Sequence, residues 1–245
     1  VVAVIMAFVV LFAKGFVNVV AIVVLVAGIL IGAIAGVVSA KKVKMTDMPQ
    51  LVSVFNTVGG GAAALVALND VLTKDGTPDL VVLITAGLGM LIGSVTFTGS
   101  LIAAGKLQGI KWVKKLSIPG KGVWNVLFAV LAIASLVMLC VQPQQRLLWS
   151  VLTTVFALCY GLVFVIPIGG ADMPVVISVL NACTGTAVAM SGLAIDNVAL
   201  IVAGALVGSA GVTLSILIAQ AMNRPLLSVL AGGFGGGADA AAAGD

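Results

Sequence analysis

Long apolar runs, separated by short charged or glycine- and proline-rich breaks, dominate the pattern of hydrophobic and polar positions along this chain. A membrane-spanning helix needs about 20 consecutive, mostly apolar residues, and the runs predict about eight such helices. The expected spans are 1–12, 18–40, 49–72, 79–104, 123–141, 147–166, 173–195 and 198–222. Because the first run is too short to cross a membrane alone, we interpret it as the remnant of a longer helix in a chain truncated at its start.

The composition indicates the same class of fold. Of the 245 residues, 62% are hydrophobic and only 8% are charged, whereas a soluble globular domain carries about a quarter charged residues. We therefore predict an all-α, polytopic transmembrane helical bundle, and we exclude a soluble globular protein. The three cysteines lie in apolar runs without metal-binding spacing, so we interpret them as small core residues and expect no metal site.

The basic residues predict the orientation of the spans. If the spans alternate in direction, nine of the 12 basic residues fall on one side of the membrane. These nine are Lys41, Lys42, Lys44, Lys106, Lys111, Lys114, Lys115, Lys121 and Arg224, while Lys14, Lys74 and Arg146 fall on the other side. Since cytoplasmic loops carry an excess of lysine and arginine, we expect the first side to be cytoplasmic.

One polar motif occurs twice in the chain. The stretch GGADMPVVISVLN at 169–181 is similar to TDMPQLVSVFN at 46–56, with an offset of 125 positions. The matched polar and proline positions are Asp47, Met48, Pro49, Ser53 and Asn56 with Asp172, Met173, Pro174, Ser178 and Asn181. The following spans are expected to align as well, at 86–87 with 203–204 and at 95–96 with 212–213. An even number of spans separates the copies, so they form a parallel repeat whose two motifs begin helices on the same, cytoplasmic face.

Each copy of the motif has the features of a helix start. An aspartate accepts hydrogen bonds from exposed backbone N–H groups, and proline is tolerated in the first turn. Structural capping is therefore one interpretation of Asp47 and Asp172. No basic residue lies near Asp172 in the sequence, however, and an unpaired carboxylate at a membrane face is a candidate proton or cation relay.

An asparagine follows each aspartate after nine residues, which is about 13 Å along a helix. This spacing places Asn56 and Asn181 near the middle of a hydrocarbon core about 30 Å thick, where an amide needs a partner inside the bundle or a water molecule. Helical spacing puts Ser178, Asn181 and Gly185 on one face, and it puts Ser53, Asn56 and Gly60 on the equivalent face. The sequence leaves open whether these faces form interhelical hydrogen bonds or a relay of ordered water.

Groups that could titrate in the middle of the membrane are scarce. The chain has no histidine and no glutamate, and the side chain of asparagine does not titrate. If protons cross this bundle, we expect a partner subunit to supply the titrating group.

Glycine is abundant, at 30 residues, and much of it lies within the expected spans. Small residues let helix backbones approach closely in a membrane. Tight helix packing is therefore predicted at Gly28, Gly32 and Gly36 and in the clusters 59–61 and 204–211.

The last residues differ in composition from the spans. Residues 231–245 are rich in glycine and alanine, and we expect them to form a linker after a transmembrane domain at 1–230. Gly233, Gly235 and Ala238 have GxGxxA spacing, but a nucleotide-binding fingerprint also requires a strand before it and an acidic residue about 20 positions later. We assign no nucleotide site to this tail.

Four stretches together carry a family resemblance. They are KKVKMTDMPQLVSVFNTVGGGAAA, GSVTFTGSLIAAGKLQG, IGGADMPVVISVLNACTG and AMNRPLLSVLAGGFG. They closely resemble the membrane part of the beta subunit of proton-translocating NAD(P) transhydrogenase, and the resemblance extends over most of the chain.

The resemblance implies a function and a set of site residues. In that family, hydride transfer between NAD(H) and NADP(H) in extramembrane domains is coupled to proton passage through a helical membrane domain. By resemblance, Asp172 and Asn181 match positions linked to proton translocation, and Arg224 matches a position at the junction with the NADP(H)-binding domain. Ser178 and Asn56 complete the expected proton pathway, and Asp47 joins Arg224 as an expected coupling residue at the cytoplasmic face. A departure from the family is the proline that follows Arg224, where serine is often found.

The resemblance also implies cofactors and partners. It places NAD(H) and NADP(H) in the full complex and none on this chain, because the NADP(H)-binding domain would follow Gly235. The implied partners are alpha subunits, in a dimeric complex of the bacterial inner membrane. Many members have a membrane histidine, and some bacterial members carry it on a separate small membrane subunit. Such a subunit would supply the titrating group that this chain lacks.

Two other classes of function remain open. A secondary transporter for a small solute or ion would use Asn56 and Asn181 as a midplane site, but the helices interrupted by glycine or proline that are expected at such a site are not evident in mid-span. A structural scaffold that holds a soluble enzyme would tolerate changes at both asparagines.

Overall fold

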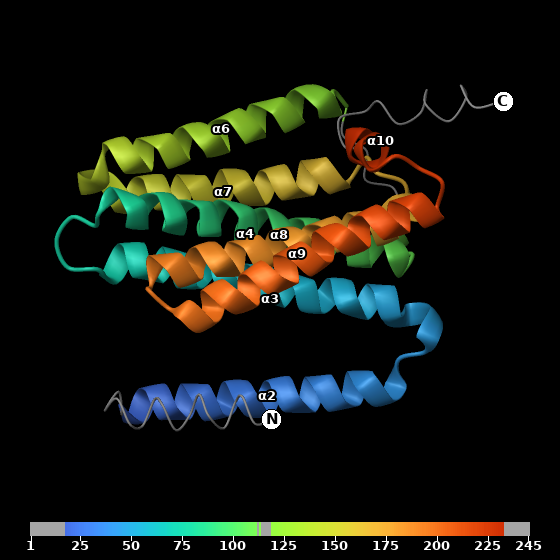
Figure 1. Cartoon of the computed structure of the whole chain (residues 1–245), viewed down its shortest axis with the longest axis horizontal. Coiled ribbons are helices and arrows are strands. Elements are labelled where there is room, and N and C mark those ends of the chain that lie inside the picture. Colours follow the sequence, from blue (N-terminus) through green and yellow to red (C-terminus); the bar gives the residue numbers. More distant parts are fainter. Residues whose placement is uncertain (1–17, 112, 114–118, 233–245) are drawn as a thin grey trace. The chain divides into compact units, whose positions relative to one another are not determined.

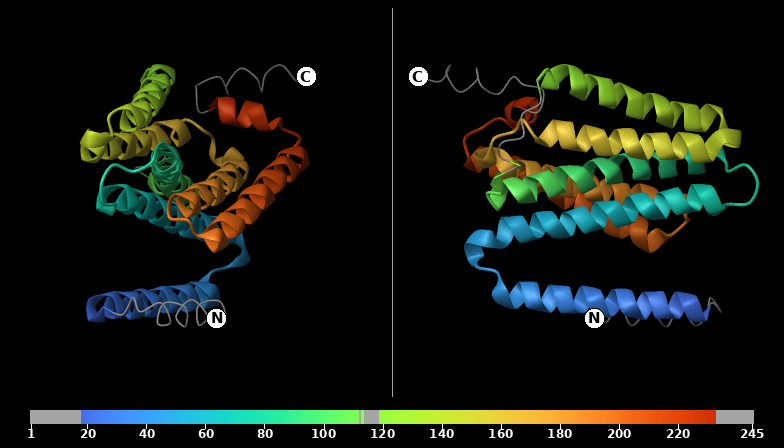
Figure 2. Two further views of the ribbon diagram at one scale, coloured as in Figure 1. Left: turned by 60° about the vertical axis from the view of Figure 1, so that its left-hand side comes forward. Right: turned by 180° about the vertical axis from the view of Figure 1, so that it is seen from behind.

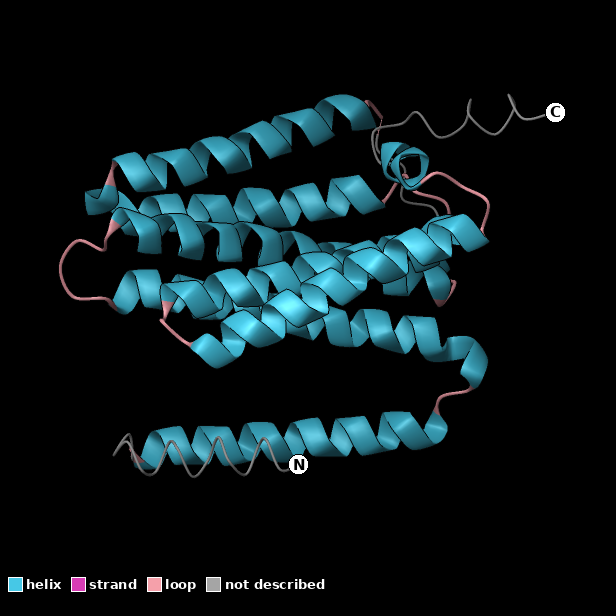
Figure 3. Ribbon diagram, in the orientation of Figure 1, coloured by secondary structure: helices cyan, strands magenta, loops and turns pink. Residues whose placement is uncertain are grey.

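Helices make up all the regular secondary structure of the described residues, and no strand occurs among them (Figure 3). The computed structural model describes residues 18–111, 113 and 119–232. The α-helices in this part are α2 (Val19–Lys42), α3 (Met48–Thr73), α4 (Leu80–Leu107), α6 (Lys121–Val141), α7 (Arg146–Val165), α8 (Met173–Ala194), α9 (Val198–Ala221) and the short α10 (Leu226–Ala231). Short 3₁₀ turns, η1 (Met45–Asp47), η2 (Pro143–Gln145) and η3 (Gly170–Asp172), precede α3, α7 and α8.

Seven of the described helices are long and apolar enough to cross a membrane. They confirm the expected spans from residue 18 onward, and every helix end lies within three residues of the expected one. The first expected span, 1–12, lies outside the described residues, as do Lys14, Lys114, Lys115 and the GxGxxA positions Gly233, Gly235 and Ala238.

The chain divides into two units, residues 1–45 and 46–245. Within the first unit, α2 begins where the Asn18 side chain accepts a hydrogen bond from the Val20 backbone N–H, 3.1 Å away. None of the residues of α2 is buried, and a Cβ added at Gly28, Gly32 or Gly36 would meet no described atom within 4 Å. The expected packing of this glycine ladder is therefore not found among the described residues.

In the second unit, α4 is the central helix. It packs against α3, α6, α7 and α8, while α9 packs against α8 (Figures 1 and 2). Successive helices run in opposite directions, so α3, α6 and α8 begin at the same end of the bundle, which we call the DMP end (Figure 1). Lys106, Lys121 and Arg224 belong to helix termini at the DMP end, whereas Lys74 and Arg146 belong to termini at the opposite end. The predicted alternation is confirmed for these helices.

The parallel repeat corresponds to two helical hairpins, α3–α4 and α8–α9. A Cβ added at Gly93 would lie 2.7 Å from the carbonyl oxygen of Gly60, and one added at Gly204 would lie 2.6 Å from that of Gly185. Both distances are too short for any side chain. The two backbones in each hairpin therefore touch at equivalent glycines, as the small-residue clusters predicted.

These contacts correct the expected alignment of the second helices of the repeat. Gly60 and Gly185 are related by the offset of 125 positions, but their partners Gly93 and Gly204 are 111 positions apart. The alignment expected from 86–87 with 203–204 used an offset of 117 and is wrong. Sequence similarity between two glycine-rich helices does not fix their register, whereas the backbone contact allows only one.

Replacement of Gly185 by alanine tests the backbone contact between α8 and α9. Its Cβ would lie 2.3 Å from the Gly208 backbone nitrogen, so the helices must separate, and we expect a loss of about 1–3 kcal/mol of stability. The measurement is thermal unfolding of the protein in mild detergent.

Gly59→Ala is the matched control for Gly185→Ala. Its Cβ would lie 3.4 Å from the Thr184 methyl carbon, an ordinary contact, and alanine is a better helix former than glycine by about 1 kcal/mol. Equal stability of the two variants would contradict the packing described for α8 and α9.

Candidate functional site

A charged contact joins the start of α8 to the segment that follows α9. Arg224 Nη1 donates to both oxygens of the Asp172 carboxylate, at 2.7 Å and 2.9 Å. The Asp172 side chain is 15% exposed and the Arg224 side chain 35%. The interpretation of Asp172 as an unpaired carboxylate is therefore wrong, because its partner lies 52 positions away in the sequence and reaches it only through the fold.

The turn after α9 explains how Arg224 reaches Asp172. Asn223 has a φ of 52°, in the left-handed region that asparagine tolerates at helix ends. The Arg224 backbone N–H then donates to the carbonyl of Ala219 at 3.0 Å, which closes the end of the helix. This turn reverses the chain, and Pro225 prevents the helix from continuing.

The two DMP motifs begin helices as expected, but their aspartates do not cap them. Asp47 and Asp172 stand at the N-cap positions of α3 and α8, and proline lies in the first turn of each helix. Neither aspartate side chain makes a capping hydrogen bond, so the capping interpretation is wrong for both. The Asp172 carboxylate accepts hydrogen bonds from Arg224 instead. Asp47 is exposed, and its side chain has no partner among the described residues.

Lys106, at the end of α4, fixes the connection between α7 and α8. Its ammonium group donates to the carbonyl of Val165 at 3.2 Å, to that of Ile168 at 2.6 Å, and to that of Ile166. Val165 is the last residue of α7, and the other two carbonyls belong to the loop that follows it, where the carbonyls have no helical partners. Lys106 therefore holds the loop that leads to Asp172 against the central helix. The sequence indicated only that Lys106 lies on the basic side of the membrane.

The polar residues of α3 bind directly to α4. Asn56 Nδ2 donates to Ser100 Oγ at 2.8 Å, and Ser53 Oγ donates to the Ser100 carbonyl at 2.8 Å. Asn56 is 6% exposed, and its Oδ1 is buried without a hydrogen bond in the described part of the chain. For Asn56 the structure thus has the interhelical hydrogen bond, one of the two arrangements that the sequence left open.

The equivalent residues of α8 behave differently from those of α3. Ser178 Oγ donates to the Gly211 carbonyl of α9 at 3.3 Å, as Ser53 does to α4. Asn181 is half-buried, and among the residues that the structure describes it has no hydrogen-bond partner. It lines a cavity of about 320 Å³ at the DMP end, between α3, α8 and α9. The lining residues are Met48, Pro49, Val52, Pro174, Ile177, Ser178, Asn181, Leu214 and Ile218.

This cavity brings the two copies of the motif together. Met48 and Pro49 of the first copy face Pro174, Ser178 and Asn181 of the second across it. Its volume is ample for water molecules, and the Asn181 amide supplies polar atoms that have no partner in the described part of the chain. Asn56 faces α4 instead, so the two expected asparagines do not form one pair.

The structure adds hydroxyl groups of α4 to the site, which the sequence analysis did not predict. Ser100 receives both polar contacts from α3, and Thr98 Oγ1 donates across the bundle to the Leu158 carbonyl of α7 at 2.9 Å. Ser94, Thr96, Thr98 and Ser100 recur at alternate positions in an otherwise apolar span. This recurrence in the sequence could have predicted polar contacts of α4, because a hydroxyl in a membrane helix needs a hydrogen-bond acceptor nearby.

Apolar helices of spanning length, packed around buried hydroxyl and amide groups, define a polytopic membrane protein with polar residues in its interior. A family model described as NAD(P) transhydrogenase beta subunit matches residues 1–245. The chain is 40% identical over 227 residues to NAD(P) transhydrogenase subunit beta of Rhodospirillum rubrum, which covers 90% of this chain and 48% of that relative. A second sequence, from a named strain of the same bacterium, matches equally well. The chain belongs to the NAD(P) transhydrogenase beta subunit family.

The match covers only part of each relative, so family membership applies to that shared part. The chain spans about half the length of the curated relatives it matches, since the shared region is 48% of each. Membership of the family and the multi-pass membrane fold apply to this shared region. Activity, nucleotides and partner subunits concern the whole complex, so for this chain they are matters of proposal.

The hydrogen bond between Asn56 and Ser100 predicts a measurable coupling. In a double-mutant cycle of Asn56→Ala and Ser100→Ala, we expect a coupling energy of about 0.6 kcal/mol, the average for interhelical hydrogen bonds in a membrane bundle. The measurement is unfolding of the purified protein in detergent. The matched cycle of Asn181→Ala with Ser100→Ala should give a coupling near zero, and a larger value there would contradict the described contacts.

Proposed function

We propose that this chain is the membrane domain of an NAD(P) transhydrogenase, in which proton passage through the bundle is coupled to hydride transfer between NADH and NADP⁺ elsewhere in the complex. The observation that carries the proposal is the ion pair between Asp172 and Arg224. It joins the carboxylate at the start of α8, the helix that carries Ser178 and Asn181 to the cavity, to the segment between α9 and α10. Proton occupancy inside the membrane can thereby act on an extramembrane domain attached beyond α10.

The ion pair connects the start of α8 to the segment after α9. It is partly buried and bidentate, so its two short hydrogen bonds hold that segment on α8 as long as the Asp172 carboxylate is charged. Protonation of Asp172 removes the charge that Arg224 binds, since a neutral carboxyl no longer attracts the guanidinium in the same way. Arg224 is then free to leave α8, and the turn at Asn223 and Pro225 can change direction.

The proposed proton pathway runs along α8 from the DMP end. Asp172 takes up a proton at the membrane face, Ser178 and Asn181 hold water in the cavity, and Asn56 with Ser100 forms the polar layer on the α3 side. Serine and asparagine can orient water but do not titrate. The pathway therefore needs a titrating group from another subunit, and we propose a small membrane subunit that carries a histidine.

Two residues at the DMP end carry the proposed coupling. Arg224 responds to the charge on Asp172 through their ion pair. Asp47 is exposed at the equivalent start of α3, where it offers a second carboxylate to an extramembrane domain that docks on this end. We propose that contacts of both residues with that domain change with the protonation of Asp172.

The remaining parts of the proposal concern the complex. NAD(H) and NADP(H) are bound by extramembrane domains, and residues 231–245 link this transmembrane domain, 1–230, to the NADP(H)-binding domain. The described residues form no strand, so they do not provide the strand–turn–helix unit of a dinucleotide site, and no step proposed for them involves nucleotide contact. The complex contains alpha subunits, is a dimer, and lies in the bacterial inner membrane with the DMP end cytoplasmic.

Single substitutions in the intact complex test the assigned roles. In proteoliposomes, Asp172→Asn should lower the rate of proton uptake coupled to transhydrogenation by about 10²-fold, since a positioned proton-transfer group contributes about that much. Asn181→Ala should also lower this rate, because it removes the amide that orients water in the cavity. Proton uptake is followed with a pH-sensitive dye, and nucleotide binding is measured separately by calorimetry.

Asp196→Asn is the matched control for these variants. Asp196 is exposed in the turn between α8 and α9 and has a φ of 52°, which asparagine tolerates. It should leave proton uptake unchanged. Unaltered proton uptake in both test variants would refute the proposed pathway, and proton movement that needs no nucleotide would favour a secondary transporter.

A further inference from the structure

Among the described residues, two aspartate side chains are partly buried, one at each end of the bundle. Asp47, Asp75, Asp79 and Asp196 are exposed. By contrast, the Asp172 side chain is 15% exposed at the DMP end, and the Asp70 side chain is 18% exposed near the end of α3, at the opposite end. Because the sequence contains no histidine and no glutamate, aspartates are its only side chains of low pKa. The proposed pathway uses Asp172 and leaves Asp70 without a role.

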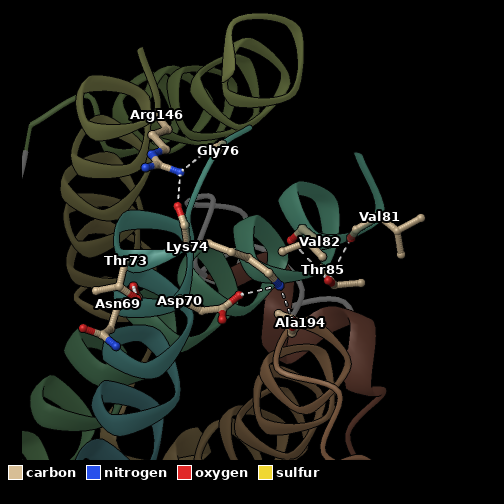
Figure 4. Close-up of polar contacts among 10 residues, drawn as sticks. All are labelled: Asn69, Asp70, Thr73, Lys74, Gly76, Val81, Val82, Thr85, Arg146 and Ala194. Atoms are coloured by element: carbon tan, nitrogen blue, oxygen red, sulfur yellow. Dashed lines mark hydrogen bonds and ion pairs between the residues drawn. The ribbon is translucent and has the colours of Figure 1, made fainter. Parts of the chain in front are cut away.

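The surroundings of Asp70 form an ordered polar cluster (Figure 4). The Lys74 ammonium lies 3.7 Å from Asp70 Oδ2 and donates to the Ala194 carbonyl at the end of α8, at 3.5 Å. Arg146, at the start of α7, donates to the carbonyls of Lys74 and Gly76 at 2.8 Å and 2.9 Å. The cluster therefore connects the hairpin α3–α4 with α7 and with α8.

The two carboxylates differ in how firmly they are held. Both oxygens of Asp172 accept short hydrogen bonds from Arg224. Asp70 Oδ2 is buried and makes no hydrogen bond within the described part of the chain, and its ion pair with Lys74 is longer than a hydrogen bond. Arg146 is directed to backbone carbonyls rather than to this carboxylate. Asp70 is thus a carboxylate with an oxygen available to a proton.

We propose that Asp70 is the residue through which the proton pathway exchanges protons with the aqueous phase at the end of the bundle opposite Asp172. This inference rests on the proposed function and extends it to the other membrane face. The partly exposed Asp70 carboxylate accepts a proton from hydronium at this face, which leaves a water molecule, and passes the proton inward to water, or carries out the reverse transfer. Only O–H bonds form and break, and no other reactant is required.

A pocket between α3, α4 and α7 lies between Asp70 and the polar layer at Asn56. Asp70 is 14 residues beyond Asn56, which is about 21 Å along α3, too far for direct transfer. Between these two levels is a cavity of about 180 Å³, lined by Gly61, Ala64, Leu65, Ser94, Phe97, Thr154 and Leu158. Ser94 is 1% exposed, and its hydroxyl has no hydrogen-bond partner among the described residues. The pocket has room for water, and in its mainly apolar lining the Ser94 hydroxyl is a polar group at an intermediate depth.

The test uses the intact complex in proteoliposomes. Asp70→Asn should lower proton translocation about tenfold or more, whereas Asp75→Asn, at an exposed carboxylate in the adjoining turn, should leave it unchanged. Formate in the solution on the Asp70 side should restore translocation in Asp70→Asn, because a small acid can carry the proton in place of the missing carboxyl. Formate on the other side should not, and Asp70→Glu should retain most of the rate.

Lys74→Met distinguishes proton transfer from a structural role of Asp70. If Asp70 serves only to hold Lys74 against α8, Lys74→Met should reproduce the loss seen in Asp70→Asn, and formate should restore neither variant. That result overturns the inference, as does wild-type translocation in Asp70→Asn. Either outcome leaves the proposed function intact when Asp172→Asn and Asn181→Ala are still defective. Failure of the proposed function itself would appear as normal translocation in those two variants.

Discussion

Direct contact between helix backbones at glycine holds each repeated hairpin together. In α3–α4 the contact lies at Gly60 and Gly93, and in α8–α9 it lies at Gly185 and Gly204. Lipid cannot satisfy polar groups in the hydrocarbon core, so a serine or an asparagine there needs a hydrogen-bond partner within the protein or in a water-filled cavity. The short distance between the backbones makes this possible, and the hydrogen bonds of Ser53 and Ser178 with the facing helices depend on it.

The two copies of the repeat differ in the contacts of their polar residues. In the first hairpin the asparagine is bound to Ser100 and the aspartate at the helix start is exposed. In the second hairpin the asparagine faces a cavity and the aspartate is bound to Arg224. The second copy thus combines a paired carboxylate with an asparagine that lines a cavity, whereas the first copy binds its asparagine to the facing helix. The two copies of one sequence motif therefore make different polar contacts.

Three charged residues connect helices by binding to backbone carbonyls. Lys106 binds the end of α7, Arg146 binds the turn between α3 and α4, and Lys74 binds the end of α8. Carbonyls at helix ends lack partners within their own helix, and a lysine or arginine near the membrane surface can supply several donors. The sequence shows only where these cations lie along the chain. Their use as connections requires that distant helix ends be close in space.

Hydrophobic runs, basic flanks and local similarity were sufficient to predict the number of spans from residue 18 onward, their ends to within three residues, their alternation and the parallel repeat. The amino-acid sequence also pointed to Asp172, Asn181 and Arg224 as residues to consider. The folded bundle was needed to see that Asp172 is paired with Arg224, that Asn56 binds Ser100 while Asn181 faces a cavity, and that the second helices of the repeat align at an offset of 111. Spans follow from local hydrophobicity, whereas the partner of a buried polar group depends on the packing of helices that are remote in sequence.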